Sequence, residues 1–165
     1  MKYIILVSVS ALAIVTGRML ASKYKKRVII LENILSFIAY IGTRIEYAIP
    51  LGEIINDYIG NGPSQLAFLE NVLRLKDEGA DFHSAWEQAL MESKSEFFGQ
   101  DYKLLLAFGT DLGSTDIEGQ KSLCNMYSSL ISENLAQAKI ESRSKGSLFG
   151  KLGIFSALFI AVIFI

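Results

Sequence analysis

The sequence predicts an all-α protein: a bundle of about six helices, with N-terminal and C-terminal transmembrane helices. Two observations predict this. Apolar residues recur at helical spacing throughout the chain, and no run shows the period-two alternation of a strand. The 165-residue chain also has a long apolar stretch at each end, although 20% of its residues are charged. We therefore expect one helical domain between two membrane spans.

The first expected span runs from Tyr3 to Ala21 and gives the segment 1–22. Its single charge, Arg18, lies near the end, where a long stem can carry it to the headgroups. A basic group follows at once, formed by Lys23, Lys25, Lys26 and Arg27. By the positive-inside rule, the residues after this span should face the cytoplasm. A cleaved signal peptide is the alternative, because Lys2 before an apolar run fits that pattern as well.

The second expected span is 148–165, with Lys151 near its start. Three basic residues precede it: Lys139, Arg143 and Lys145. They again predict that the domain between the spans, 23–147, is cytoplasmic and that both termini lie outside. The expected protein is thus a multi-pass membrane protein with two spans.

The domain begins with a continuation of the first span. An apolar stripe extends this helix to about Tyr47. Pro50 is expected to open a short helix to about Tyr58, and Pro63 to start another that Gly79 closes. Asp81 can cap the next helix, on which Trp86 should face the core.

A fifth helix is expected to end at a tight turn on Gly113. Thr115 and Glu118 have the spacing of a capping box for the last helix. If they form it, Asp116 and Gln120 face outward. That last helix should run into the second span.

The sequence shows no group of residues with the spacing of a catalytic or metal-binding site. The lone His83 lacks a metal-ligand partner at suitable spacing, and the lone Cys124 lies on an apolar stripe, as core cysteines do. Glycines near position 113 lack the strand and Gly-Lys-Ser/Thr of a phosphate loop. We therefore expect no cofactor, no metal and no enzymatic activity.

Charge is unevenly distributed. Residues 28–138 carry 16 acidic and 6 basic side chains, whereas the membrane-proximal stretches are basic. An acidic domain argues against nucleic acid as a partner, and basic collars suit anionic lipid headgroups. The acidic surface is either simply solvated or a docking face for a basic partner.

Four motifs, in order, resemble the stage III sporulation protein AB family of endospore-forming bacteria. Residues 108–120 are similar to its F-G-x-x-L-G-x-x-D-x-x-x-Q segment, and residues 46–51 approximately to its E-x-x-Y-x-x-x-P-L region. Residues 85–90 match A-W-x-x-A-L, and Lys151-Leu152-Gly153 resembles the entrance to its final span. The interaction candidates on these motifs are Phe108, Gly109, Gly113, Asp116, Gln120, Glu46, Pro50 and Lys151.

The resemblance implies a structural, platform-like component of the membrane channel complex that joins mother cell and forespore. This family is similar to the platform proteins of type II secretion and type IV pilus systems. The implied partners are other subunits of the complex, including its cytoplasmic ATPase, the lipid bilayer and a second copy of the chain. A sensory or regulatory membrane protein with a helical signalling domain is the alternative function.

Overall fold

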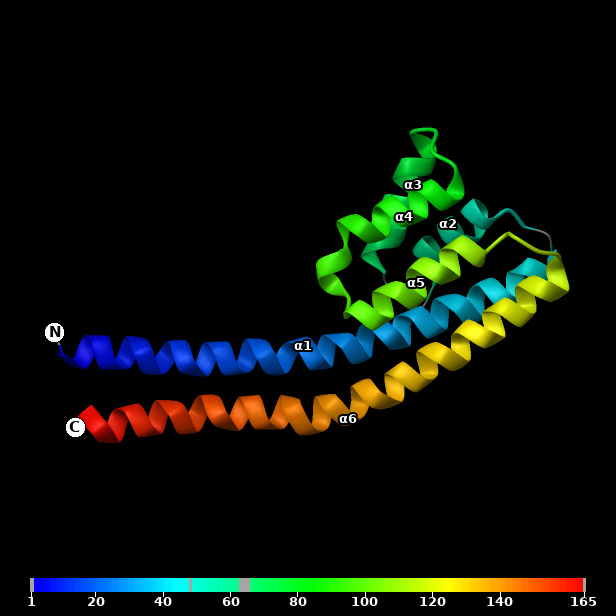
Figure 1. Ribbon diagram of the computed structural model, residues 1–165. Coiled ribbons are helices and arrows are strands. Elements are labelled where there is room, and N and C mark those ends of the chain that lie inside the picture. Colours follow the sequence, from blue (N-terminus) through cyan, green and yellow to red (C-terminus); the bar gives the residue numbers. More distant parts are fainter. Residues whose placement is uncertain (1, 48, 63–65, 165) are drawn as a thin grey trace. The chain divides into compact units, whose positions relative to one another are not determined.

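The computed structural model describes residues 2–47, 49–62 and 66–164, and these are almost entirely helical (Figure 1). Before Val15 the only side chain described is that of Leu12, and after Lys145 those of Leu148, Lys151 and Phe155. No strand occurs in the described ranges, so the predicted all-α fold is confirmed. The elements are α1 (Lys2–Arg44), η1 (Ile45–Tyr47), α2 (Leu51–Asn61), α3 (Ala67–Asp77), α4 (Phe82–Glu92), η2 (Lys94–Glu96), α5 (Gly99–Asp111) and α6 (Ile117–Phe164).

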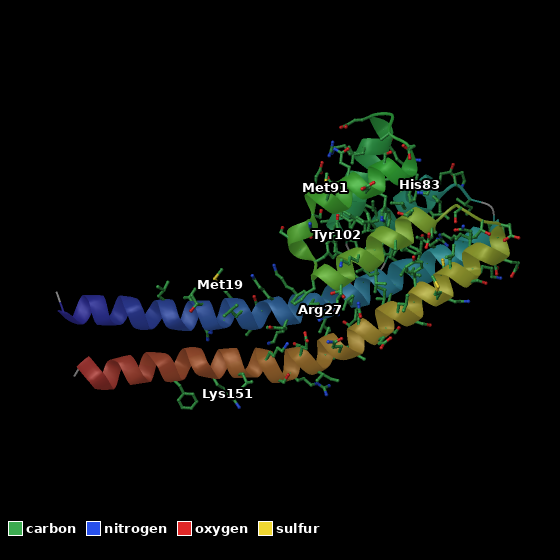
Figure 2. All side chains as sticks on the ribbon, in the orientation of Figure 1. Met19, Arg27, His83, Met91, Tyr102 and Lys151 are labelled. Atoms are coloured by element: carbon green, nitrogen blue, oxygen red, sulfur yellow. The ribbon has the colours of Figure 1, made fainter. Side chains whose placement is uncertain are left out.

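The chain forms two compact units. The helix-pair unit consists of Met1–Ile29 and Ala136–Ile165, and the bundle unit is Ile30–Leu135. In the helix-pair unit, Arg27 of α1 donates to Glu141 of α6 at 3.0 Å, and only 4% of the Arg27 side chain is exposed (Figure 2). One turn away, the Lys145 ammonium lies 5.7 Å from the centre of the Tyr24 ring. The two helices therefore run antiparallel where these residues meet.

The core of the bundle unit is built around Trp86 of α4, which is 1% exposed, as predicted. Its ring packs edge-on against Phe68 of α3 and against Phe108 of α5, with centroids 5.1 and 6.1 Å away. The indole Nε1 donates to the Leu105 carbonyl at 2.9 Å, so the buried N–H is satisfied. The apolar stripe predicted for α1 is also buried, from Leu31 to Ile45.

Most helix ends lie where capping residues and glycines in the sequence predicted them. The Asp81 carboxylate accepts from the backbone N–H groups of His83 and Ser84, which makes it the cap of α4. Gly79, after α3, has φ +98°, a conformation that glycine adopts without cost. Helix α2 extends past the expected Tyr58 to Asn61. The expected helix start at Pro63 lies outside the described residues.

Helix α1, together with η1 after it, includes a stretch long and apolar enough to cross a membrane. Among the described residues this stretch is Val15–Tyr47, with a mean hydropathy of 1.6. It contains the stripe from Leu31 to Ile45 that packs in the bundle core, so its apolar character also serves the fold. Most side chains of the predicted spans, 1–22 and 148–165, lie outside the description. The two-span topology therefore stays a prediction.

Candidate functional site

The connection between α5 and α6 is a closed corner. Gly113 has φ +86°, as the predicted tight turn requires. Its backbone N–H donates to the side-chain oxygen of Gln120 at 2.9 Å, and the Gln120 amide nitrogen lies 3.4 Å from the Thr115 carbonyl. Gln120 is only 5% exposed. The expectation that it faces outward is wrong, because this side chain is the internal tie of the corner.

The cap of α6 also differs from the expectation. Asp116, not Thr115, is the capping residue: its carboxylate accepts from the Gly119 N–H at 2.9 Å, and its carbonyl accepts from Gln120. The expected capping box of Thr115 with Glu118 is therefore wrong. Glu118 is exposed and lies 3.9 Å from Lys121. Asp116 is exposed but is occupied in starting the helix.

Phe108 and Gly109 hold the corner to the core. Phe108 is 1% exposed, and its ring lies edge-on to Tyr127 of α6 at 5.2 Å. Gly109 is buried against Trp86, as the expectation of close helix packing requires. The hydroxyl of Tyr127 donates to the Asp111 carboxylate at 2.6 Å, which adds a second link between α5 and α6.

The residues after α1 reach the same corner. The Glu46 carboxylate lies 2.5 Å from the Lys121 ammonium, one turn into α6. Pro50 directly precedes α2, and its carbonyl accepts from the Glu53 and Ile54 N–H groups, so it starts that helix as predicted. A Cβ atom at Gly113 would lie 3.4 Å from the Leu51 side chain. Two motifs more than 50 residues apart therefore meet at one place in the bundle unit.

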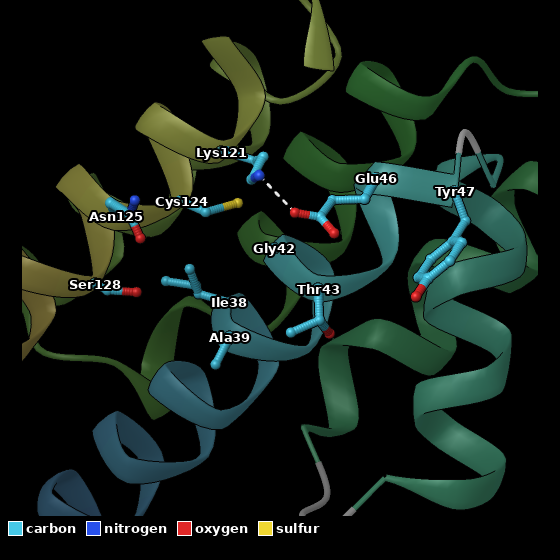
Figure 3. A pocket seen from close by; sticks show the side chains of 10 residues that line it. All are labelled: Ile38, Ala39, Gly42, Thr43, Glu46, Tyr47, Lys121, Cys124, Asn125 and Ser128. Atoms are coloured by element: carbon cyan, nitrogen blue, oxygen red, sulfur yellow. Dashed lines mark ion pairs between the residues drawn. The ribbon is translucent and has the colours of Figure 1, made fainter. Parts of the chain in front are cut away.

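An open groove of about 560 Å³ lies beside this meeting point, between the end of α1 and the start of α6 (Figure 3). Small and polar side chains line most of it, and the Glu46–Lys121 ion pair lies at one end. The lining residues are Ile38, Ala39, Gly42, Thr43, Glu46, Tyr47, Lys121, Cys124, Asn125 and Ser128.

The titratable groups that line this groove include a buried thiol and a paired ammonium. Burial raises the pKa of the Cys124 thiol to about 11, so the thiol is protonated at neutral pH and is a poor nucleophile. The hydrogen bond to Glu46 raises the pKa of Lys121 and keeps it charged. Across the described part of the chain, no three His, Cys, Asp or Glu side chains gather as metal ligands would.

Lys151 belongs to the helix-pair unit, where its side chain is exposed (Figure 2). It is therefore not one of the residues gathered at the corner.

Four residues at the corner were not among the interaction candidates chosen from the sequence: Lys121, Tyr127, Tyr47 and Ile117. Helical spacing places Tyr127 on the apolar stripe of α6, but it does not reveal the Tyr127–Asp111 and Lys121–Glu46 contacts, because those partners lie on other elements. Tyr47 is 75% exposed and Ile117 is 44% exposed, so both present apolar surface to solvent. The one sequence signal for this exposed surface was Tyr47, an aromatic residue at an expected helix end.

Together these observations define an all-helical protein whose first helix is long and apolar enough to cross a membrane, and whose motif residues mainly join helices. The chain belongs to the stage III sporulation protein AB family, whose family model matches residues 2–165. This is the family predicted by resemblance, and membership implies a role in stage III of sporulation. It is not a known enzyme family. No curated protein and no solved structure matches the chain.

Proposed function

We propose that this protein is a membrane-embedded, platform-like structural component of the channel complex that links mother cell and forespore. Its domain 23–147 would be cytoplasmic, between spans in the mother-cell membrane that faces the forespore. Family membership supports a stage III role, and the basic residues on both sides of the domain support a cytoplasmic position.

The observation that carries the proposal is the gathering of two of the four family motifs, residues 46–51 and 108–120, at one corner. Buried members of these motifs, Phe108, Gly109 and Gln120, fix the corner internally. Around them lies a surface with exposed apolar and charged groups, which we call the corner surface: Glu46, Tyr47, Ile117, Glu118 and Lys121. An exposed tyrosine on a rigid base is a typical anchor of a protein interface.

The proposed partners of the corner surface are other subunits of the complex, and the cytoplasmic ATPase is one of them. A second copy of the chain would contact the same surface in a homo-oligomer. A platform needs a fixed shape and a membrane anchor rather than an active site, in agreement with the protonated thiol of Cys124 and the structural use of the motif residues.

The test is co-purification of the tagged full chain from sporulating cells. The double variant Tyr47→Ala with Ile117→Ala should lose channel-complex subunits and block spore formation, because the exposed anchors are gone while the core is intact. The matched control is Met91→Ala, which removes an apolar side chain that is 63% exposed on α4. Normal co-purification and sporulation of the double variant would reject the corner surface as a docking site.

A further inference from the structure

The helix-pair unit has a charge opposite to that of the bundle unit. Its residues 18–29 and 136–151 together carry nine basic side chains and one acidic side chain, Glu141. Residues 30–135 of the bundle unit carry 16 acidic and 6 basic side chains. Cations are thus concentrated on one unit rather than spread for solubility. A surface of this kind attracts a polyanion.

The one acid of this basic segment is neutralised internally. The Glu141 carboxylate lies 3.0 Å from the buried Arg27 guanidinium and 3.2 Å from the Lys145 ammonium. It therefore presents no net negative charge to an approaching anion. The other basic side chains are exposed: Arg18, Lys23, Lys25, Lys26, Lys139, Arg143 and Lys151.

Exposed apolar side chains lie among these cations. On α1, Met19 and Ile29 are 62% and 55% exposed, and on α6, Ile140 and Leu148 are 69% and 57% exposed. Met19 and Lys151 point away from the helix pair in Figure 2. Large apolar groups beside lysine stems suit the boundary between acyl chains and headgroups, where both parts find a favourable environment. A soluble polyanion would leave the apolar groups in water.

The ring of Tyr24 supports the same occupant. It is half-buried, and the Lys145 ammonium lies 5.7 Å from its centre. Tyrosine is enriched where a protein passes from hydrocarbon to headgroups, because the ring is apolar and the hydroxyl is polar. Aromatic, basic and apolar groups therefore occur together over one short length of the helix pair.

We propose that the segment formed by residues 18–29 and 139–151 binds the phosphate headgroups of anionic phospholipids, with Lys25, Lys26 and Arg143 as principal contacts. This inference rests on the proposed membrane embedding. It adds a preference for the kind of lipid: phosphatidylglycerol or another anionic lipid should gather around the protein, while zwitterionic phosphatidylcholine should not. Each basic side chain at an anionic surface favours binding by about fivefold.

The experiment uses the full chain reconstituted in vesicles with equal amounts of phosphatidylcholine and phosphatidylglycerol. Discs are cut from these vesicles with styrene–maleic acid copolymer, and the two lipids around the protein are quantified. We expect the ratio of phosphatidylglycerol to phosphatidylcholine around the protein to exceed the bulk ratio by about fivefold, the effect of one engaged basic side chain. An unchanged lipid ratio would overturn the inference.

Two triple variants assign the effect to this segment. Lys25→Gln, Lys26→Gln and Arg143→Gln together should return the lipid ratio to that of the bulk. The charge-preserving variant, Lys25→Arg, Lys26→Arg and Arg143→Lys, should retain the enrichment, so a loss through misfolding is recognised. The matched control on the bundle unit is Arg74→Gln, Lys94→Gln and Lys103→Gln, which should leave enrichment unchanged. Equal loss in this control would also overturn the inference.

The source of the phosphate and the membrane embedding are tested separately. Inorganic phosphate should reduce the enrichment no more than sodium chloride of the same ionic strength, and a larger reduction would assign the segment to free phosphate. Alkaline carbonate should leave the wild type and all variants in the membrane fraction. Release by carbonate would reject the proposed membrane embedding, whereas retention without lipid enrichment would reject only the lipid preference.

Discussion

A Cβ atom at Gly109 would lie 2.1 Å from the indole Cδ1 of Trp86, so α4 and α5 can approach as they do only because residue 109 has no side chain. The same glycine offers its carbonyl to the Nδ1 of His83 at 2.9 Å. The one histidine of the chain is thus engaged in packing α4 against α5. This contact lies next to the corner and sets the position from which α5 enters it.

Gly109→Ala should destabilise the bundle unit. The added methyl group has no room beside the indole, and overpacking of this kind costs about 1–3 kcal/mol. The measurement is the melting temperature of the full chain in detergent. Gly60→Ala is the matched control: no atom lies within 4 Å of the added Cβ on α2, so the melting temperature should hold or rise. Equal melting of both variants would contradict the contact.

Trp86→Ala should cost about 3–5 kcal/mol, because it removes a large, fully buried side chain and leaves a cavity between the rings of Phe37, Phe68, Phe82 and Phe108. It also leaves the Leu105 carbonyl without its indole donor. Chemical denaturation of the full chain measures this loss. Met91→Ala on the same helix should change stability by less than about 0.5 kcal/mol, since that side chain is exposed.

Gln120→Ala should lower stability by about 1–3 kcal/mol, because the Gly113 N–H loses its acceptor in a part-buried site. Gln120→Glu keeps the acceptor oxygen and should be milder at neutral pH. Asp116→Ala should cost about 0.5–2 kcal/mol as the loss of a helix cap. Melting curves of the three variants measure these losses of stability. A double Asp116 and Gln120 variant with wild-type stability would restore the outward-facing interpretation.

The contacts of Asp57 should make stability fall in acid. Hydrogen bonds from Tyr40, Asn61 and Arg44 lower the pKa of this carboxyl from 3.8 to about 2. A lowered pKa means that the folded state favours the charged form, so the stabilisation is complete well above pH 3.8 and is lost as the pH falls towards 2. Melting temperatures across this window should decline less steeply in Asp57→Asn. The control Asp77→Asn, on an exposed part of α3, should follow the wild type.

The proposed topology predicts opposite behaviour of two reporter fusions. A reporter inserted after Asn61, at the end of α2, should be active in the cytoplasm, and one fused after Ile165 should be active outside it. Each reporter is measured in intact sporulating cells. The reverse pattern would reject the cytoplasmic domain, and a cytoplasmic signal from both would reject the second span.

The helices were predictable because the information for them is local. Apolar spacing gave the buried stripe of α1, and single residues gave the ends at Asp81 and Gly113. The contacts at the corner were not predictable, because Gln120 and Lys121 find their partners only after the chain has folded back. From the sequence alone, a polar side chain is predicted to be exposed unless its buried partner is known.

The cap of α6 shows a second limit of prediction from sequence. Thr115 and Asp116 are both good capping residues, and their side chains differ by one position along the chain. Spacing to Glu118 favoured Thr115, whereas the structure starts the helix one residue later at Ile117. The choice depends on where Gln120 must lie to reach the Gly113 N–H, which is a requirement of the whole corner.

The internal tie between Gln120 and Gly113 has a consequence for association. A connection that waits for a partner before it takes its shape loses conformational entropy on binding, and that loss weakens the complex. Here one side-chain amide closes the loop from within, and the Asp116 cap fixes the residue where α6 begins. Ile117 is thus held in one position before any partner binds, so a subunit docking at the proposed corner surface would meet a preorganised surface. Less of its contact energy would then be spent on ordering this connection.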